Sequence, residues 1–506
     1  MTCEVLVVGA GIGGLTVAAL AAARGMSVCV VEKESRGGGC VAAFEKFGYR
    51  FEPTAGLYSG WGEDEIHARV FAELPVAPPA AHQLSPAYTV RLPDAAQVRA
   101  GAETAVEFEN ELRAAFPECA ITAINFYRDL HALADARAEL ARRATTRPGL
   151  FQRLKGGGDA QRAARLVAAR SETVAPHLAG ASPRFRRFID SQLQLFASCA
   201  SDECSYLDAT DALDAARRGL YALEGGAAAL ADTLTESIRL SGGSLRFDTT
   251  ALRLAYDAAG AVSGVELMSG ETLRASRAYV SNLTAWDTYG KLVGASRTPA
   301  AVRARLKSLR GWGAYLIFLS LEEDAAARLP STRMLLLDDS EVGADSEPPR
   351  AEFDPARDLF TLNVAPAWDV RAPAGRRAAT LCAFADAGEW FTYHEDESEH
   401  EAQDRHALEF WWERLHRALP ELGAGAEVIE TLTPRGYYEQ TRRRLGAVWG
   451  AARTVEVAAG ADDDAASYRT HLPNLYLVGD TAAGANTVAA VTRAARAVAN
   501  EIAPPR

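Results

Sequence analysis

Apolar runs alternate with a helical stretch in the first fifty residues of the chain. Residues 5–8 are all apolar, which is typical of a strand buried on both faces of a parallel sheet. Residues 15–24 have the alanine-rich composition of a helix, and residues 27–31 form a second apolar run. This pattern predicts a strand–helix–strand unit and therefore an α/β fold.

Two later parts of the chain repeat these signals. Residues 227–239 read as a helix and residues 244–247 as a strand. Residues 252–256, 262–267 and 279–281 read as the strands of a small antiparallel sheet. Near the C-terminus, residues 474–478 form an apolar strand and residues 486–499 form a helix. We expect all three parts to contribute to one domain, although the chain separates them.

The longest uncharged stretch runs from residue 5 to residue 23. Its nineteen residues would suffice for a membrane span. Four glycines interrupt it, and no basic residue precedes it, so a buried strand–turn–helix explains the stretch better.

Those glycines form a phosphate-binding signature directly after the first strand. Gly9, Gly11 and Gly14 have the G-x-G-x-x-G spacing, with Ile12 and Gly13 between them. The spacing permits a tight turn, a close approach to a pyrophosphate and close helix–strand packing. Glu32 ends the second strand, where a carboxylate accepts hydrogen bonds from a ribose with a free 2′-hydroxyl, and Lys33 follows it. The sequence therefore predicts a dinucleotide site.

Two further motifs favour FAD over NAD. Gly38, Gly39 and Cys40 follow soon after Glu32, and the strand near the C-terminus ends in Gly479 and Asp480. The helix that follows begins at Asn486, Thr487 and Val488. Its N-terminal dipole would stabilise negative charge on a reduced flavin. Only one dinucleotide signature is visible, so we expect no separate NAD(P)H domain.

This pattern resembles the carotenoid isomerase, phytoene desaturase and retinol saturase group of flavoproteins. The matching motifs are Gly38-Gly39-Cys40, Gly48-Tyr49-Arg50-Phe51-Glu52, Thr433-Pro434, Gly446-Ala447-Val448-Trp449-Gly450 and Gly479-Asp480-Thr481. The resemblance spans nearly the whole chain and is strongest at residues 3–60, 219–285 and 431–506. It also assigns Gly56, Leu57 and Ala251 to the cofactor site.

The resemblance implies a glutathione-reductase-type FAD-binding Rossmann domain that is discontinuous in the chain. It would be built from residues 1–75, 219–300 and 430–506. A mixed α+β substrate domain would take residues 76–218 and 301–429 and carry a helical cap. The most basic part of that cap, residues 142–187, has eleven Lys and Arg against two acids in a chain of net charge −12. We interpret it as a lid or an interface with an anionic surface.

Composition narrows the class further. The chain has 506 residues, and its acidic balance argues against nucleic-acid partners. Its seven cysteines are an odd number without a CxxC pair, which favours a reducing compartment. The histidines and acids of residues 394–406 lack metal-site spacing and fit a solvated helix start, so we predict no metal.

Candidate residues for chemistry are fewer. Glu52 could place a carboxylate near the flavin ring or accept local N–H groups as a structural residue. The resemblance suggests that Tyr58 faces the substrate. Trp312 and Tyr315 could line an apolar tunnel or pack in the core. A basic group interleaved with Tyr437 and Tyr438 could anchor an anionic substrate head group or lie on a surface helix; its members are Arg435, Arg442, Arg443 and Arg444.

The expected activity is FAD-dependent desaturation, saturation or cis–trans isomerisation of a hydrophobic conjugated polyene. Three alternatives remain: a tailoring oxidoreductase or reductive cyclase on a polyene polyketide, a flavin amine oxidase, and a non-enzymatic lipid- or prenyl-binding carrier. We expect a cytoplasmic protein with a hydrophobic small-molecule substrate, and contact with a membrane surface is left open. The electron acceptor or donor stays undetermined.

Overall fold

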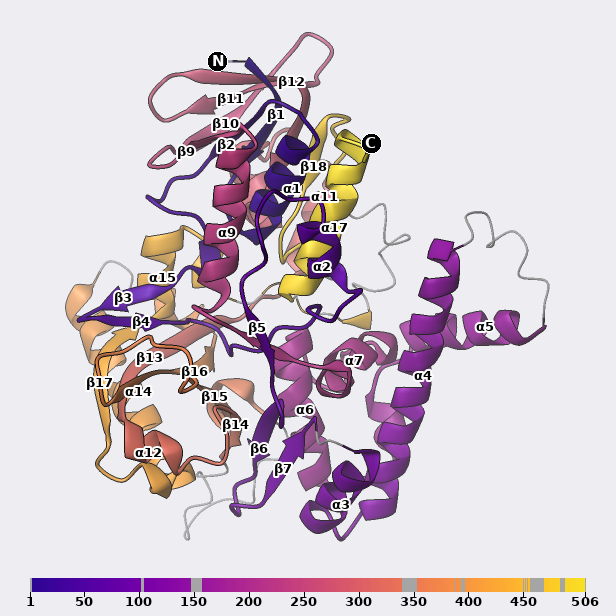
Figure 1. Cartoon of the computed structure of the whole chain (residues 1–506), viewed down its shortest axis with the longest axis vertical. Coiled ribbons are helices and arrows are strands. Elements are labelled where there is room, and N and C mark those ends of the chain that lie inside the picture. The colour runs from indigo at the N-terminus through magenta and orange to yellow at the C-terminus, as the bar shows by residue number, and fades with distance from the viewer. Residues whose placement is uncertain are drawn as a thin grey trace.

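The computed structural model describes residues 2–101, 104–146, 157–338, 353–386, 388–392, 396–448, 450, 452, 454–455, 468–482 and 487–505. Figure 1 shows two sheets, one above the other, with a group of long helices beside the lower one. The upper sheet carries both the N-terminal strand and the last strand of the chain. This arrangement confirms the α/β class and the Rossmann-like first domain.

The upper sheet has a parallel centre and an antiparallel extension. The parallel strands run in the order β9 (Ser244–Arg246), β2 (Val28–Val31), β1 (Thr2–Val8), β12 (Thr272–Ser281) and β18 (Leu475–Leu477). The first half of β12 also pairs antiparallel with β11 (Val262–Leu267), which pairs with β10 (Ala251–Tyr256). Strands far apart in sequence therefore share one sheet. The predicted antiparallel pairing of residues 279–281 is wrong, because this end of β12 lies between the parallel strands β1 and β18. The exact domain boundaries stay a prediction.

Helices cover both faces of this sheet. The helices α1 (Ile12–Ala23), α9 (Ala227–Leu240) and α17 (Val488–Ile502) share one buried core with strands β1 and β2, and α2 (Ile66–Phe71) packs on α17. On the other face, α10 (Ala285–Asp287), a π-helical turn at Thr288–Leu292 and α11 (Ala300–Ser308) pack against β10 and β11. The helix α1 is apolar all round because it is enclosed by its neighbours.

The lower sheet is mostly antiparallel. Its order is β17 (Ala426–Leu432), β13 (Gly313–Glu322), β16 (Arg376–Ala385), β15 (Leu359–Val364), β14 (Arg333–Leu337), β6 (Tyr88–Arg91) and β7 (Gln97–Ala100), with only β14 and β6 parallel. β17 crosses the predicted domain boundary at residue 430. α14 (Glu397–Ala418) and α12 (Glu323–Ala327) cover one face, and α15 (Pro434–Thr441) with the ribbon β3 (Phe44–Lys46) and β4 (Tyr49–Phe51) packs on the other.

The helical cap packs on the β6–β7 end of the lower sheet. It contains α3 (Ala105–Ala115), α4 (Ala120–Thr146), α5 (Gly157–Ser171), α6 (Pro183–Ala197), α7 (Tyr206–Leu213) and α8 (Ala215–Arg218). A two-stranded ribbon, β5 (Ala81–Gln83) with β8 (Tyr221–Leu223), joins the two lobes. The predicted lid covers the end of α4, α5 and the start of α6, and its residues 147–156 lie outside the described part of the chain.

Smaller elements complete the described structure. They are the short helices at Gly39–Val41, Ala175–Leu178, Glu389–Phe391, Pro420–Leu422 and Arg444–Gly446, and α13 (Pro355–Asp358). Within the described ranges, no helix combines the length and the apolar character that a bilayer crossing requires. All seven cysteines are free thiols.

Candidate functional site

The glycine turn joins β1 to α1 with very close backbone contacts. Gly9 has φ +95°, which is the left-handed region that favours glycine. A Cβ atom on Gly14 would lie 2.3 Å from the carbonyl oxygen of Gly9, so only glycine lets the helix approach the strand this closely. The first turn of α1, which starts at Ile12 after Gly11, presents its N–H groups at the edge of the sheet.

The carboxylate of Glu32 is fixed beside this turn. Its Oε2 accepts a hydrogen bond of 2.7 Å from the backbone N–H of Ala10, and its Oε1 accepts one of 3.0 Å from that of Glu34. Two backbone donors hold an ionised acceptor in one orientation at the carboxyl end of β2. This is the place that the sequence assigns to the acid that recognises the ribose.

Asn282 ties the three chain segments together, and sequence reasoning missed it. It follows β12, and its Oδ1 accepts a hydrogen bond of 3.0 Å from the N–H of Gly14. A Cβ atom on Gly11 would lie 2.4 Å from its Nδ2, and one on Gly13 would lie 2.6 Å from its Oδ1. The only sequence signal is an asparagine at the end of a predicted strand, 268 positions away from Gly14.

The opposite end of the site is built by the last strand and helix. Gly479 has φ +119° and leads into Asp480, and the Thr487 side chain caps α17 by accepting from Ala490 N. Nη2 of Arg443 donates to Oδ2 of Asp480 at 2.6 Å. Burial opposes the charge on Arg443, but the Asp480 carboxylate together with Cys40 and Tyr437 outweighs it, and the pKa of Arg443 lies above its ordinary value.

These parts enclose a first cavity of about 940 Å³. This lies within the range of about 300–1,000 Å³ that is usual for small-molecule and cofactor sites. Most of the predicted cofactor residues line it, namely Gly9, Gly11, Ile12, Gly13, Glu32, Lys33, Gly38, Gly39, Cys40, Gly56, Leu57, Ala251, Gly479, Asp480, Thr487 and Val488. Gly14 lies behind the turn, and Asn486 lies outside the described residues.

Glu52 is not among the residues that line this cavity. Its Oε1 accepts from Tyr58 Oη and from Ala227 N, and its Oε2 accepts from Asn363 and Arg371 at 3.1 Å each. Burial alone would raise the pKa of Glu52, yet the nearby guanidinium groups of Arg371 and Arg333 hold it below its usual value. The geometry favours the structural acceptor over a carboxylate that meets substrate.

Tyr58 does line the first cavity. Its hydroxyl donates to Glu52 and lies 2.9 Å from the Thr54 hydroxyl. Burial and the charge of Glu52 raise the pKa of Tyr58 well above its ordinary value, so the phenol stays protonated. The loop between Glu52 and Tyr58 is thereby fastened on its far side, because Arg333 also donates to the carbonyl of Gly56 at 3.0 Å.

Two other predicted substrate residues, Tyr315 and Arg435, do not line the first cavity. Tyr315 is buried in the lower sheet's core, stacks on Trp390, and donates to Oδ1 of Asp404 at 2.6 Å, so the core interpretation fits it. Arg435 forms an ion pair of 2.7 Å with Glu397 on the outer surface of α15. Arg442 and Arg443, just beyond the same helix, line the first cavity instead.

Apolar side chains from both the cap and the lower sheet form another part of the lining of the first cavity. Leu195 and Phe196 come from the end of α6 in the cap, whereas Phe318 and Leu432 come from the lower sheet. Val448 follows the short helix after α15 and lies against the same space. Both lobes therefore contribute to one site, which is polar at the Rossmann side and apolar at the side of the cap and the lower sheet.

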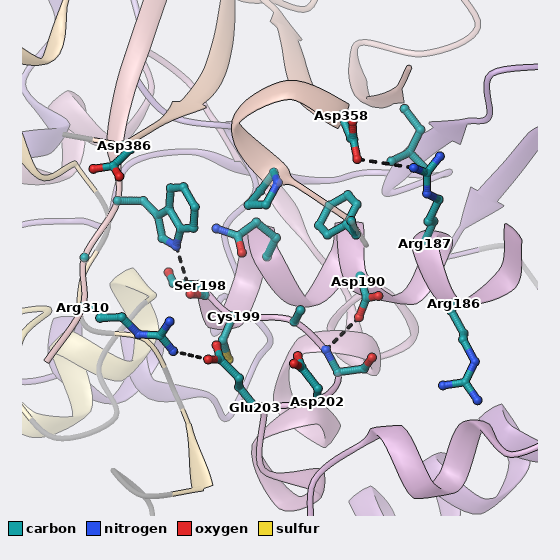
Figure 2. A pocket seen from close by; sticks show the side chains of 18 of the residues that line it. Arg186, Arg187, Asp190, Ser198, Cys199, Asp202, Glu203, Arg310, Asp358 and Asp386 are labelled. Atoms are coloured by element: carbon teal, nitrogen blue, oxygen red, sulfur yellow. Dashed lines mark hydrogen bonds and ion pairs between the residues drawn. The ribbon is translucent and has the colours of Figure 1, made fainter. Parts of the chain in front are cut away.

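A second cavity of about 1430 Å³ lies between the cap and the segments that flank the lower sheet (Figure 2). Trp312, predicted to face substrate, lines this cavity rather than the first one. Its indole Nε1 donates to the carbonyl oxygen of Ser198 at 3.2 Å. Residues that are neighbours in the chain line different cavities. Gln194 and Ala447 line the second cavity, whereas Leu195 and Val448 line the first.

Within the described residues, no group of three or more His, Cys, Asp or Glu side chains is placed to hold a metal ion. The histidine- and acid-rich stretch considered above begins with His394 and Glu395, which lie outside those residues. Asp396 caps α14 by accepting from Ser398 N and Glu399 N, as expected for a helix start.

Comparisons with known proteins agree with this geometry. A family model of NAD(P)-binding Rossmann-like domains matches residues 7–74, which contain the glycine turn and Glu32. An oxidoreductase from Methanosarcina mazei has a similar structure, with a TM-score of 0.62 at 18% identity over 98% of this chain and 99% of its own. The fold is therefore that of dinucleotide-binding oxidoreductases.

Two amine oxidases share the fold over nearly the whole chain. Putrescine oxidase in complex with putrescine has a TM-score of 0.65 at 14% identity and covers 99% of both chains. Cyclohexylamine oxidase from Brevibacterium oxydans has a TM-score of 0.58 at 18% identity and covers 99% of this chain and 98% of its own.

Sequence similarity points to a different relative. The chloroplastic prolycopene isomerase of Arabidopsis thaliana is 25% identical over 312 residues, which cover 58% of this chain and 50% of that protein. The carrot (Daucus carota) enzyme is 24% identical over 302 residues, covering 58% of this chain and 48% of its own. The match thus spans about half the length of these relatives. The predicted resemblance to the carotenoid isomerase group is confirmed.

Proposed function

We propose that this protein is an FAD-dependent oxidoreductase that acts on a hydrophobic conjugated polyene. The reaction would be desaturation, saturation or cis–trans isomerisation. One observation carries the proposal: a single cavity has the phosphate-binding turn and Glu32 in one part of its lining, and apolar side chains of the cap and lower sheet in another. A dinucleotide bound in the first part would meet an apolar substrate in the second.

The residues of the first cavity fit FAD. A side chain at Gly11 or Gly13 would collide with Asn282, and the backbone N–H groups of Ile12 and Gly13 at the start of α1 would bind the pyrophosphate, while that of Gly14 donates to Asn282. Glu32 would accept from the ribose, Asp480 would hold the ribityl chain, and the N-terminus of α17 would face the pyrimidine. When bound, FAD supplies the capacity to accept or return a hydride.

The chain's own contribution is to bind the polyene and exclude water. Leu195, Phe196, Phe318, Leu432 and Val448 offer aliphatic and aromatic surface without competing donors. Among the described residues, the charged groups Asp480 and Arg443 neutralise one another, as do Asp287 and Lys291 at 2.7 Å. The similarity to prolycopene isomerases supports a polyene substrate. Because the fold is shared with amine oxidases, an amine is the competing candidate substrate.

The first test is the visible absorption spectrum of the purified protein, followed by anaerobic reduction. Flavin bands near about 370 and 450 nm that bleach on reduction are the expected result. Linear carotenes and aliphatic amines would then be offered to the oxidised and to the reduced protein. Turnover of amines alone would replace the polyene by the amine oxidase function. A protein that stays colourless after FAD is added would overturn the enzyme and favour a carrier.

A further inference from the structure

The helix α6 presents a polar face to the second cavity. Arg187, Asp190, Gln194 and Ser198 recur at intervals of three or four residues, so they share one side of the helix and its C-terminal turn. Figure 2 shows Arg187, Asp190 and Ser198 along this side of the cavity. Leu195 and Phe196, on a different side, line the first cavity. The C-terminal end of α6 therefore contributes apolar side chains to the first cavity and polar side chains to the second.

Two glutamines of α6 are equally buried but differ in their partners. Gln192 is fully satisfied, because its Nε2 donates to Tyr127 Oη and Phe188 O while its Oε1 accepts from Tyr88 at 2.8 Å. Gln194 is 1% exposed, and its Nε2 has no hydrogen-bond partner among the described residues. A buried amide donor without a partner is destabilising, and because Gln194 lines the second cavity, a ligand there could supply the missing acceptor.

Ser198 offers a second donor on the same wall. It ends α6 in the left-handed conformation, with φ +59°, and its buried Oγ also lacks a partner among the described residues. Its backbone is fixed, since its N–H donates to Gln194 O at 3.1 Å and its carbonyl accepts from the Trp312 indole. Ser198 therefore has a fixed backbone at the cavity lining and a buried hydroxyl that is available to a ligand.

Ion pairs join some of the charged groups around this cavity, while Arg186, Lys307 and Arg444 line it as well. Arg187 pairs with Asp358, Arg310 with Glu203, and Arg184 with Asp94. The opposite wall is apolar and carries Trp286, Leu306, Leu309, Trp312 and Phe353. Gln194 and Ser198 are neutral donors, so an apolar body with a neutral acceptor oxygen would find both surfaces that it needs.

We propose that the second cavity binds the oxygenated end of a long apolar substrate, with a neutral carbonyl oxygen accepting hydrogen bonds from Gln194 and Ser198. That the bound compound is the substrate rests on the proposed function, while the binding itself does not. The inference narrows the substrate class from a pure hydrocarbon polyene to a polyene that carries a carbonyl group.

The test measures probe binding to the full chain as purified, by fluorescence. Three probes are compared: methyl parinarate, a conjugated tetraene with an ester carbonyl; parinarate, its carboxylate; and diphenylhexatriene, a hydrocarbon. Gln194→Leu and Ser198→Gly each remove one donor, and glycine tolerates the left-handed backbone at position 198. Gln161→Leu, the same substitution on an exposed position of cap helix α5, is the control.

Each donor variant is expected to weaken methyl parinarate binding about 5- to 10-fold, which is the worth of one neutral hydrogen bond. Diphenylhexatriene binding should not change, and Gln161→Leu should change neither. Equal losses for both probes, no loss for the ester, or tightest binding of the carboxylate would each overturn the inference. Thermal unfolding of each variant confirms folding. A protein without flavin bands that still binds the ester through Gln194 would remove the proposed function alone.

Discussion

At the scale of single residues, Glu52 and Arg371 form a buried ion pair between the two lobes. Their side chains are 5% and 4% exposed, and Nη1 of Arg371 lies 3.1 Å from Oε2 of Glu52. Arg371 also pairs with Asp369, and Asn363 donates to Glu52. Such a network is costly to break, because each removed partner leaves a buried charge uncompensated.

Replacing Glu52 by Gln should therefore lower the free energy of unfolding by about 3 kcal/mol. The double variant Glu52→Gln with Arg371→Met should be more stable than the sum of the two single losses predicts, because no lone charge remains. Urea unfolding followed by tryptophan fluorescence measures both. Strictly additive losses would show that the pair does not act as a unit.

His67 makes stability depend on pH. It is 1% exposed, stacks on Trp61 at 4.2 Å between ring centroids, and its Nε2 has no partner among the described residues. Burial, with a smaller effect of Arg493, lowers the pKa of His67 to about 3. Below about pH 6.5 the unfolded chain therefore takes up a proton that the folded chain refuses, and stability falls as the pH falls.

At pH 5 this effect amounts to about 2 kcal/mol relative to pH 7.5, as the gap between the two pKa values requires. His67→Phe removes the titrating group and keeps a flat ring against Trp61. Urea midpoints of both proteins at pH 7.5, 6 and 5 check the prediction: the variant should lose less stability than the parent on acidification. Parallel losses would assign the pH dependence to other groups.

At the scale of elements, the contact of α1 with β1 depends on Gly14. Gly14→Ala places a methyl group against the Gly9 carbonyl, so helix and strand must separate. We expect a loss of about 2 kcal/mol or more in stability, together with the loss of FAD binding. The control is Gly290→Ala, where nothing lies within 4 Å of the added methyl group and the change should stay within about 0.5 kcal/mol. FAD titration and thermal unfolding of both variants decide the matter.

The elements that sequence reasoning predicts well are those with a local signal. The turn after β1, Glu32 at the end of β2 and the start of α17 each follow from residues that are neighbours in the chain. Tyr315 and Trp312 show the limit of such signals. Trp312 directly precedes β13, and Tyr315 lies within β13 three positions later. Tyr315 is buried in the core, yet Trp312 lines the second cavity.

Contacts between distant segments could not be predicted from the sequence. Arg333, Asn363 and Arg371 surround Glu52, but each looks like an ordinary polar residue within or after a strand. Asn282 reaches Gly14 only because β1 and β12 pair in register. The sequence therefore leaves open the role of Glu52 and which arginines of the group Arg435, Arg442, Arg443 and Arg444 reach the first cavity, because both depend on how the two sheets pack.

At the scale of the whole molecule, the first cavity draws its walls from both lobes and the cap. A ligand bound there should stabilise the entire chain rather than the Rossmann lobe alone. Free FAD at about 100 times its dissociation constant should raise the free energy of unfolding by about 2.7 kcal/mol. Urea unfolding of the apoprotein with and without FAD, followed by tryptophan fluorescence and by circular dichroism, should show one common shift. A shift in only one probe would mean that the lobes unfold independently.

The position of β18 and α17 in the chain has a consequence for how the protein is made. The glycine turn emerges from the ribosome early, but Asp480 and the helix that complete the site follow only after the cap and the lower sheet have been translated. Domains generally fold as units during synthesis. The Rossmann lobe therefore stays incomplete until β18 is translated, and the edge of β12 that pairs with β18 is unpaired until then. Cofactor loading is then a late event, and a chain that stalls before β18 would carry the nucleotide signature without retaining the nucleotide.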